Sequence, residues 1–127
     1  MTRRRSPAHA IDPDGIRLME DMFGPERAER RSHPEHAADG RMNSLLVEFA
    51  YARVWANEIL TRRERSLITV ALLAATGREN ELSLHLEAAV KNGASHDELR
   101  EVMVHLALYC GFPAGLTGQR HLRKMHK

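Results

Sequence analysis

The sequence predicts an all-α protein with one main domain. Three observations support this class: apolar residues recur at helical spacing from residue 44 onward, two capping-box patterns open helices, and no credible pair of strands is present. A chain of 127 residues has the usual length of one domain and can bury a core without disulfides or metals. Residues 1–40 are polar and rich in proline, so we expect an N-terminal arm there and the helical domain over 41–127.

The arm offers one short helix. Residues 14–24, "DGIRLMEDMFG", place Ile16, Met19 and Phe23 at helical spacing. Residues 26–41, "ERAERRSHPEHAADGR", have little to bury and predict a loop or flexible segment. The next helix covers residues 42–60, where the apolar residues at helical spacing are Leu45, Leu46, Phe49, Val54 and Trp55.

Two helices follow in the middle of the chain. "TRRE" is a capping box in which Thr61 caps a helix and Glu64 reaches back. The run from Leu67 to Ala75 is apolar on nearly all sides, which is typical of the middle of a bundle or of a subunit contact. Gly77 ends this helix, and residues 78–93 form the next one, which stops at Gly93.

"SHDE", with Ser95 and Glu98, opens a further helix by the same capping logic. One face of that helix carries Leu99, Val102, Met103, Leu106 and Cys110. Val104 and Leu108 are apolar on its other face, so we expect its second half, including Cys110, to be covered all round. Pro113 then interrupts the chain before a weaker last helix. This much apolar helix in a small chain predicts a homo-oligomer.

The composition indicates which compartment and which kinds of partner to expect for this protein. A single cysteine excludes an intrachain disulfide and fits a reducing compartment. No apolar run reaches the length of a membrane span, and the start lacks an apolar signal core, so we expect a cytoplasmic protein without a membrane partner. The net charge is only +2. The basic segment "GQRHLRKMHK" occurs without any recognised nucleic-acid-binding motif in the sequence. We therefore expect no nucleic-acid partner.

The stretch "RENELSLHLEAAVKNG", residues 78–93, poses the functional question. At about 100° per residue, its polar residues Arg78, Glu81, His85 and Asn92 fall within an arc of roughly 60° beside the apolar stripe. Glu81 and His85 are then either a helix-stabilising pair, a metal half-site or an acid–base pair. A zinc site needs three or four ligands, and the other histidines form no second pair of convincing spacing, which makes the metal site the weaker reading.

The order of motifs resembles the carboxymuconolactone decarboxylase family, which shares an all-helical fold with the alkylhydroperoxidase-like proteins. The most specific parts are "RENELSLHLEAAVKNG", "ELREV" and "YCGFPA", and "EFAYARVW" is similar to the helix that precedes this core. The resemblance covers roughly residues 44–126. It implies an alkylhydroperoxidase-like helical bundle, a homo-oligomer that is often a trimer or hexamer, and no metal or organic cofactor.

The reaction that the resemblance implies is loss of carbon dioxide from 4-carboxymuconolactone to give 3-oxoadipate enol-lactone, a step in aromatic-acid breakdown. The substrate is then a small carboxylate-bearing lactone. We expect His85 to transfer the proton and Glu81 to orient it. Arg78 or Arg65 would bind a substrate carboxylate, and the candidate pocket walls are Tyr109 and Trp55, for which core packing is the alternative.

Two features keep other substrates open. Ala52 and Arg53 stand where decarboxylases of the family are expected to have glycine and glutamate before "VW", and the loop "ANEILTRRER" lacks an expected Pro-Gly. A relative acting on another cyclic or polyketide-derived acid is therefore an alternative. The related peroxidases carry a C-x-x-C pair where this chain has Arg78 and Glu81, so peroxidase-type redox chemistry is a weaker alternative, and a non-catalytic binding protein is another.

Overall fold

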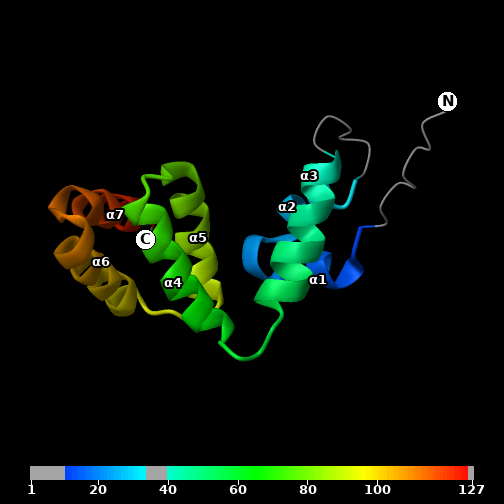
Figure 1. Cartoon of the computed structure of the whole chain (residues 1–127), viewed down its shortest axis with the longest axis horizontal. Helices are drawn as coiled ribbons and strands as arrows, with labels where there is room; N and C mark the ends of the chain where they lie inside the picture. The colour runs from blue at the N-terminus through cyan, green and yellow to red at the C-terminus, as the bar shows by residue number, and fades with distance from the viewer. Residues whose placement is uncertain (1–10, 34–39, 126–127) are drawn as a thin grey trace. The chain divides into compact units, whose positions relative to one another are not determined.

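The computed structural model describes residues 11–33 and 40–125, and within them every regular element is a helix (Figure 1). This confirms the all-α prediction. The chain divides into two compact units between Glu58 and Ile59. Within the described ranges, no helix combines the length and the apolarity that crossing a bilayer would need.

The first unit contains α1 (Pro13–Phe23), α2 (Pro25–Arg31), α3 (Gly40–Leu45) and the π-helical η2 (Leu46–Trp55). Helix α1 confirms the predicted short helix, and Asp12 caps it by accepting a hydrogen bond from the Asp14 amide. Helix α2 shows that the loop predicted over residues 26–41 was wrong for its first part. Pro25 presets the first turn, and Ala28 finds a buried position, which composition alone underrated. The remainder of that segment, residues 34–39, lies outside the described residues.

The winding of η2 changes which side chains are buried. The amide of Ala56 donates to the carbonyl of Tyr51, five residues earlier, at 3.0 Å. Within η2, Val47 and Tyr51 are buried, whereas Phe49 and Val54 of the predicted apolar face are exposed in the single chain, as is Leu45 at the end of α3. The prediction assumed the spacing of an α-helix, and the wider π-helical turn alters that register.

Contacts within the first unit join α1 and α2, α1 and η2, and α3 and η2. The Tyr51 ring meets the Phe23 ring edge-on at 5.7 Å, and burial raises the pKa of Tyr51 to about 12. Residues 40–58 thus group with the two helices before them. The domain boundary near residue 40 stays a prediction.

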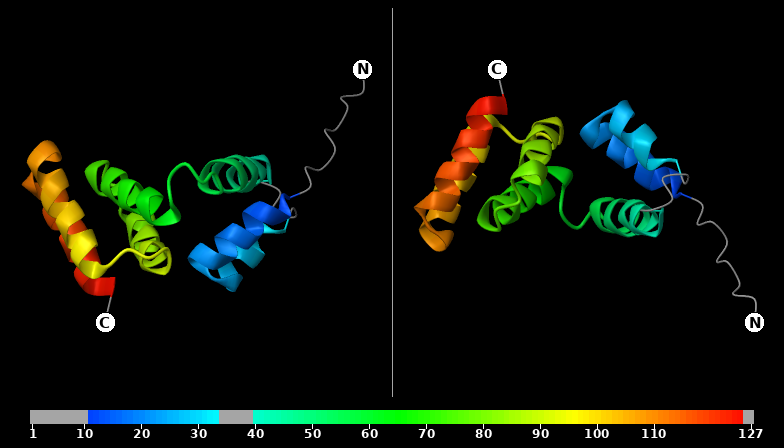
Figure 2. Two further views of the ribbon diagram at one scale, coloured as in Figure 1. Left: turned by 90° about the horizontal axis from the view of Figure 1, so that it is seen from below. Right: turned by 90° about the horizontal axis from the view of Figure 1, so that it is seen from above.

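The second unit contains α4 (Arg62–Ala75), α5 (Glu79–Lys91), α6 (His96–Cys110) and α7 (Phe112–Met125). Helices α4 and α5 form one hairpin and α6 and α7 form another, and α4 and α5 both contact α7 (Figures 1 and 2). Their shared core consists of Val70, Ala74, Leu82, Leu86, Ala89, Ala94, Leu99, Met103, Leu106 and Leu122.

Both predicted capping boxes are confirmed. The Glu64 amide donates to Thr61 Oγ1 at 3.0 Å and the Thr61 amide donates to Glu64 Oε1 at 2.8 Å. The pair Ser95 and Glu98 repeats this arrangement at 3.0 and 2.9 Å. Helix α4 ends before Gly77, whose φ of 73° lies in the left-handed region that glycine adopts readily.

The expectation that the second half of α6 is covered all round was wrong for the single chain. Val104 is 53% exposed and Leu108 is 73% exposed, because α4 and α7 cover only one side of α6. Cys110, which was also expected in the core, is exposed. On α4, Ile68 and Leu72 are exposed as well. The second unit therefore carries apolar surface that its own helices leave open.

Helices α6 and α7 approach closely at two glycines. A Cβ atom at Gly115 would lie 2.7 Å from the Cβ of Ala107 and 2.9 Å from the carbonyl oxygen of Met103. A Cβ atom at Gly118 would instead meet the flexible thioether of Met103, 2.2 Å from its sulfur. The first position has no room for a methyl group unless the backbones separate.

We expect Gly115→Ala to lower the free energy of unfolding by about 1–3 kcal/mol, because overpacking a helix contact outweighs the better helix propensity of alanine. Gly118→Ala is the matched comparison, with the same gain in propensity and a neighbour that can move. Urea unfolding of both variants checks this, and a Gly115→Ala protein as stable as Gly118→Ala would contradict the close approach.

Candidate active site

The imidazole of His85 lies at the edge of the buried stripe of α5. Leu82 and Leu86 are fully buried in the core, and His85 lies between them in sequence with a half-buried side chain. Its Nδ1 atom is inaccessible to solvent. Burial lowers the pKa of His85, and the negative charge of Glu81, one turn earlier, acts in the opposite direction. The site therefore favours the neutral imidazole at neutral pH and makes its protonated form a stronger acid.

The two candidate arginines approach α5 from different places. Arg78 is the N-cap residue of α5, and its amide donates to the Leu73 carbonyl at 2.9 Å while its side chain is exposed. Arg65 lies on α4, the helix that packs against α5, and its Nε atom is inaccessible to solvent. One guanidinium is thus at the surface end of α5 and the other is partly buried on the neighbouring helix.

A polar contact joins α4 and α5 on the side of α5 that carries His85. The Nδ2 of Asn92 donates to the Oγ of Ser66 at 3.0 Å, and Ser66 is buried. Asn92 belongs to the polar line predicted from the sequence. Ser66 was missed, because serine is mostly exposed in folded proteins and nothing in the local sequence marks this one as buried.

The aromatic candidates lie elsewhere. Tyr109 is near the end of α6, is 76% exposed and has its ring 5.3 Å from the ring of His105. Trp55 ends η2 in the first compact unit, where its ring stacks on Tyr51 at 6.2 Å. Arg78, Glu81 and His85 thus lie along one edge of α5, whereas Tyr109 lies on α6 and Trp55 belongs to the other unit.

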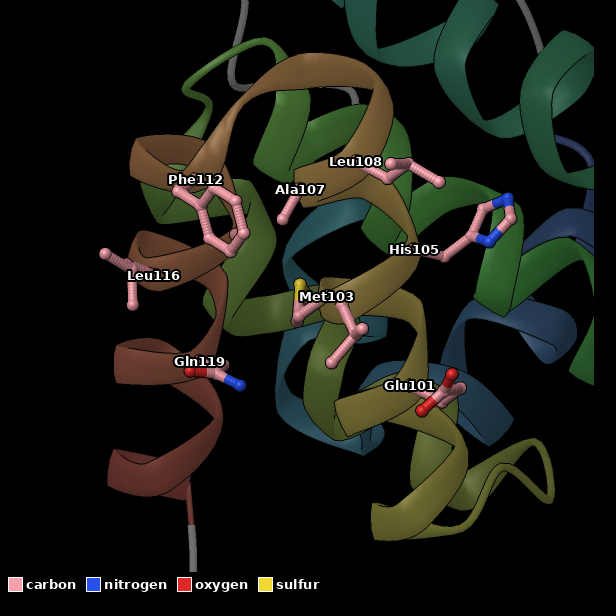
Figure 3. Close-up of a pocket in the computed structure, with 10 residues that line it drawn as sticks. Glu101, Met103, His105, Ala107, Leu108, Phe112, Leu116 and Gln119 are labelled. Carbon is pink, nitrogen blue, oxygen red and sulfur yellow. The ribbon is translucent and has the colours of Figure 1, made fainter.

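A groove of about 680 Å³ runs between α6 and α7 (Figure 3). Its walls are mostly apolar, with Phe112 and Leu116 on α7 and Leu108 on α6, and its polar residues are Glu101, His105 and Gln119. None of the six sequence-predicted site residues lines it. Among the residues that the structure describes, no group of three or more His, Cys, Asp or Glu side chains is arranged to hold a metal ion.

Comparison with known proteins places the chain in a family. Residues 41–118 match the carboxymuconolactone decarboxylase family. A 4-carboxymuconolactone decarboxylase of Acinetobacter baylyi is 36% identical over 113 residues, which are 89% of this chain and 84% of that protein. A nitrosuccinic acid decarboxylase of Metarhizium robertsii is 34% identical over 101 residues, 80% of this chain and 71% of that protein.

The chain belongs to the carboxymuconolactone decarboxylase family. It is a carboxy-lyase, as are both named relatives. The resemblance that rested on "RENELSLHLEAAVKNG" and "YCGFPA" is confirmed at the level of the family.

Nuclear magnetic resonance titration of the His85 ring should give a pKa below the usual value of about 6.5, because burial disfavours the imidazolium. Glu81→Gln should lower the pKa further, since it removes the charge that opposes burial. As the folded pKa is depressed, His85 stabilises the fold fully above about pH 6.5 and less as the pH falls toward the folded pKa.

Glu87→Gln is the control for this titration, because Glu87 is an exposed carboxylate on the same helix and is not among the causes of the His85 shift. A His85 pKa that rises in the Glu81→Gln protein would show that the two side chains do not interact as described.

Proposed function

We propose that the protein is a cofactor-free decarboxylase that converts 4-carboxymuconolactone to 3-oxoadipate enol-lactone. The observation that carries the proposal is the half-buried imidazole of His85 at the edge of the α5 stripe, with Glu81 one turn before it. The relative in Acinetobacter baylyi, whose name gives this substrate, supports the choice.

The chemistry needs few protein groups. When the bond to the carboxylate breaks, carbon dioxide leaves and the electron pair spreads into the conjugated lactone and its carbonyl oxygen. The substrate is its own electron sink, so the protein has to bind the anion, stabilise the enolate and deliver one proton to carbon. His85 delivers that proton in its protonated form, the minor form at neutral pH, which the negative charges of Glu81 and of the bound substrate favour. The pKa lowered by burial makes this form a stronger acid. The neutral ring then regains a proton from solvent.

The other residues have supporting roles in this proposal. Glu81 orients the imidazole and stabilises its protonated form through its charge. Arg78 or Arg65 binds a carboxylate of the substrate, because a guanidinium can hold both oxygens at once. Tyr109 is proposed as a wall of the pocket.

A second candidate substrate has a specific observation behind it. The nitrosuccinic acid decarboxylase is nearly as similar to this chain as the lactone decarboxylase. A nitro group, like a conjugated lactone, accepts the electron pair that decarboxylation releases, so the same proton-transfer machinery serves both. Ala52 and Arg53, which depart from the pattern expected of lactone decarboxylases, leave room for such a different acid. Other cyclic or polyketide-derived acids stay in the same class of alternative.

Disulfide-based peroxidase chemistry is a weaker alternative. The sequence has one cysteine, Cys110, so no vicinal pair of thiols can form within a chain. Arg78 and Glu81 occupy the positions where the related peroxidases carry their two cysteines.

We also propose that the protein works as a homo-oligomer, a trimer or a hexamer. The exposed apolar side chains of the α6–α7 groove, Val104, Leu108, Phe112 and Leu116, support this because single chains rarely leave such contiguous surface open to water. Cover from a second copy would also make the exposed Tyr109 a wall rather than a surface residue.

His85→Ala should reduce kcat on 4-carboxymuconolactone by about 10²–10⁴, the usual contribution of a positioned proton donor. Ultraviolet absorbance of the lactone follows the reaction, and circular dichroism establishes that the variant is folded. Nitrosuccinate, assayed in parallel, separates the two candidate substrates. Full kcat in folded His85→Ala protein on the preferred substrate would refute the assignment.

Leu108→Glu should shift the protein to smaller species in analytical ultracentrifugation, because a charge buried in an apolar contact costs several kcal/mol. Lys124→Glu, a charge change at an exposed polar position of α7, should leave the sedimentation unchanged. A wild-type protein that sediments as a monomer at micromolar concentration would exclude the oligomer.

A further inference from the structure

A cluster of hydrogen bonds ties the start of α5 to α7. His121 on α7 lies with its Nε2 2.7 Å from Glu79 Oε1 and its Nδ1 2.9 Å from Ser83 Oγ. The Nη2 of Arg120 donates to the same Glu79 oxygen at 3.1 Å. Glu79 and Ser83 are one turn apart on α5, so two neighbouring residues of α7 hold the first turn and a half of that helix. We call these four side chains the α5–α7 clamp.

The hydrogen bonds of the clamp are mutually compatible. With His121 neutral, its Nε2–H donates to the Glu79 carboxylate and its Nδ1 accepts from the Ser83 hydroxyl, so both ring nitrogens have a partner. The His121 side chain is 15% exposed and is therefore largely shielded from competing water. The pKa of the Glu79 carboxyl lies below its usual range, chiefly because His121 donates to it.

The clamp and the candidate catalytic residues occupy different edges of α5. At about 100° per residue, Glu79 and Ser83 point roughly 100–160° away from Arg78 and His85, with the buried stripe of the helix between the two groups. The clamp therefore touches neither His85 nor Arg78. However, the clamp fixes the position of the Glu79 carboxylate, which is the negative charge nearest to Arg78 in the sequence.

Arg78 and Arg120 both lie near the start of α5, but they differ in their partners. Arg120 shares Glu79 with His121, whereas Arg78 makes no ion pair with a described residue. If Glu79 were released from α7, its carboxylate would be a mobile negative charge one residue from the Arg78 guanidinium. That charge would weaken the local positive potential that draws an anionic substrate.

We propose that His121 and Arg120 are positioning residues for the decarboxylase: by holding the Glu79 carboxylate against α7, they leave the Arg78 guanidinium available to bind a substrate carboxylate. The inference rests on the binding role that the proposed function gives to Arg78. In this proposal, Arg120 and His121 of the basic segment "GQRHLRKMHK" act on a residue of the same chain, Glu79, and need no anionic partner.

The test compares His121→Ala with the double variant His121→Ala/Glu79→Gln. In low salt, His121→Ala should raise KM for 4-carboxymuconolactone and Kd for succinate, measured by titration calorimetry, by about two- to fivefold, the size expected of a charge exposed to solvent. The kcat should stay within about twofold, because proton transfer at His85 is untouched. The double variant, which lacks the released charge, should return both constants to near the wild-type values. Salt at about 0.5 M should shrink the defect of the single variant through screening.

Two further variants make the result specific. In an Arg78→Gln background, His121→Ala should no longer change the Kd for succinate, because the guanidinium that the clamp keeps available is absent. Arg120→Ala, at a half-exposed position, should show a smaller rise in Kd and serves if His121→Ala does not fold. Lys124→Ala, which removes a positive charge from the same helix outside the clamp, should bind succinate like the wild type.

The outcomes separate the clamp from the proposed reaction. If no lactone turnover is found but succinate binding is weakened by His121→Ala and rescued by the double variant, the proposed substrate is wrong and the clamp stands. If the double variant binds as weakly as His121→Ala, the contact supports only packing and the proposal is overturned. Failure of the wild-type protein to bind succinate overturns it as well.

Discussion

The burial of one apolar stripe of α5 is the constraint on which the rest of the molecule depends. Leu82, Leu86 and Ala89 are withdrawn from water into the core that α4, α6 and α7 share. Burying this stripe fixes the rotation of α5 about its own axis. His85 is then carried to the edge of the core, where its imidazole loses water without becoming part of the apolar interior. The lowered pKa of His85 is a consequence of packing that its neighbours in sequence only moderate.

Apolar burial alone leaves a helix able to slide and roll by small amounts, and α5 is held against both motions by polar contacts. On the His85 side, Asn92 donates to the buried Ser66 of α4. On the other side, Glu79 and Ser83 bind His121 of α7. The contacts lie near opposite ends of α5 and on opposite edges of its stripe. If His85 is the proton donor, as we propose, a displacement of about 1 Å from its productive position would slow the reaction strongly, and two such anchors limit displacements of this kind.

The same helices that build the core leave apolar surface exposed on their outer side. The close approach at Gly115 brings α7 against α6 but turns Phe112 and Leu116 outward beside Leu108. The chain belongs to the carboxymuconolactone decarboxylase family, and in our proposal the polar face of α5 carries the decarboxylase chemistry. The outward apolar surface of α6 and α7 belongs to assembly in our proposal, and the same assembly would cover Tyr109 near the end of α6.

Helix ends and the polar line of α5 could be predicted from the sequence because both depend on local spacing. The capping boxes at Thr61 and Ser95 satisfy backbone amides within three residues, and the position of His85 beside its apolar stripe follows from helix geometry. The π-helical register of η2, the exposure of Leu108 and Cys110, and the clamp formed by Glu79 and His121 could not be predicted in this way. They depend on which helices pack together and how closely, and partners some forty residues apart meet only when the whole bundle forms. The sequence by itself thus determined the family and the polar edge of α5. Tertiary packing decided which charged side chains face each other, because distances between helices set these pairs and no local sequence pattern encodes those distances.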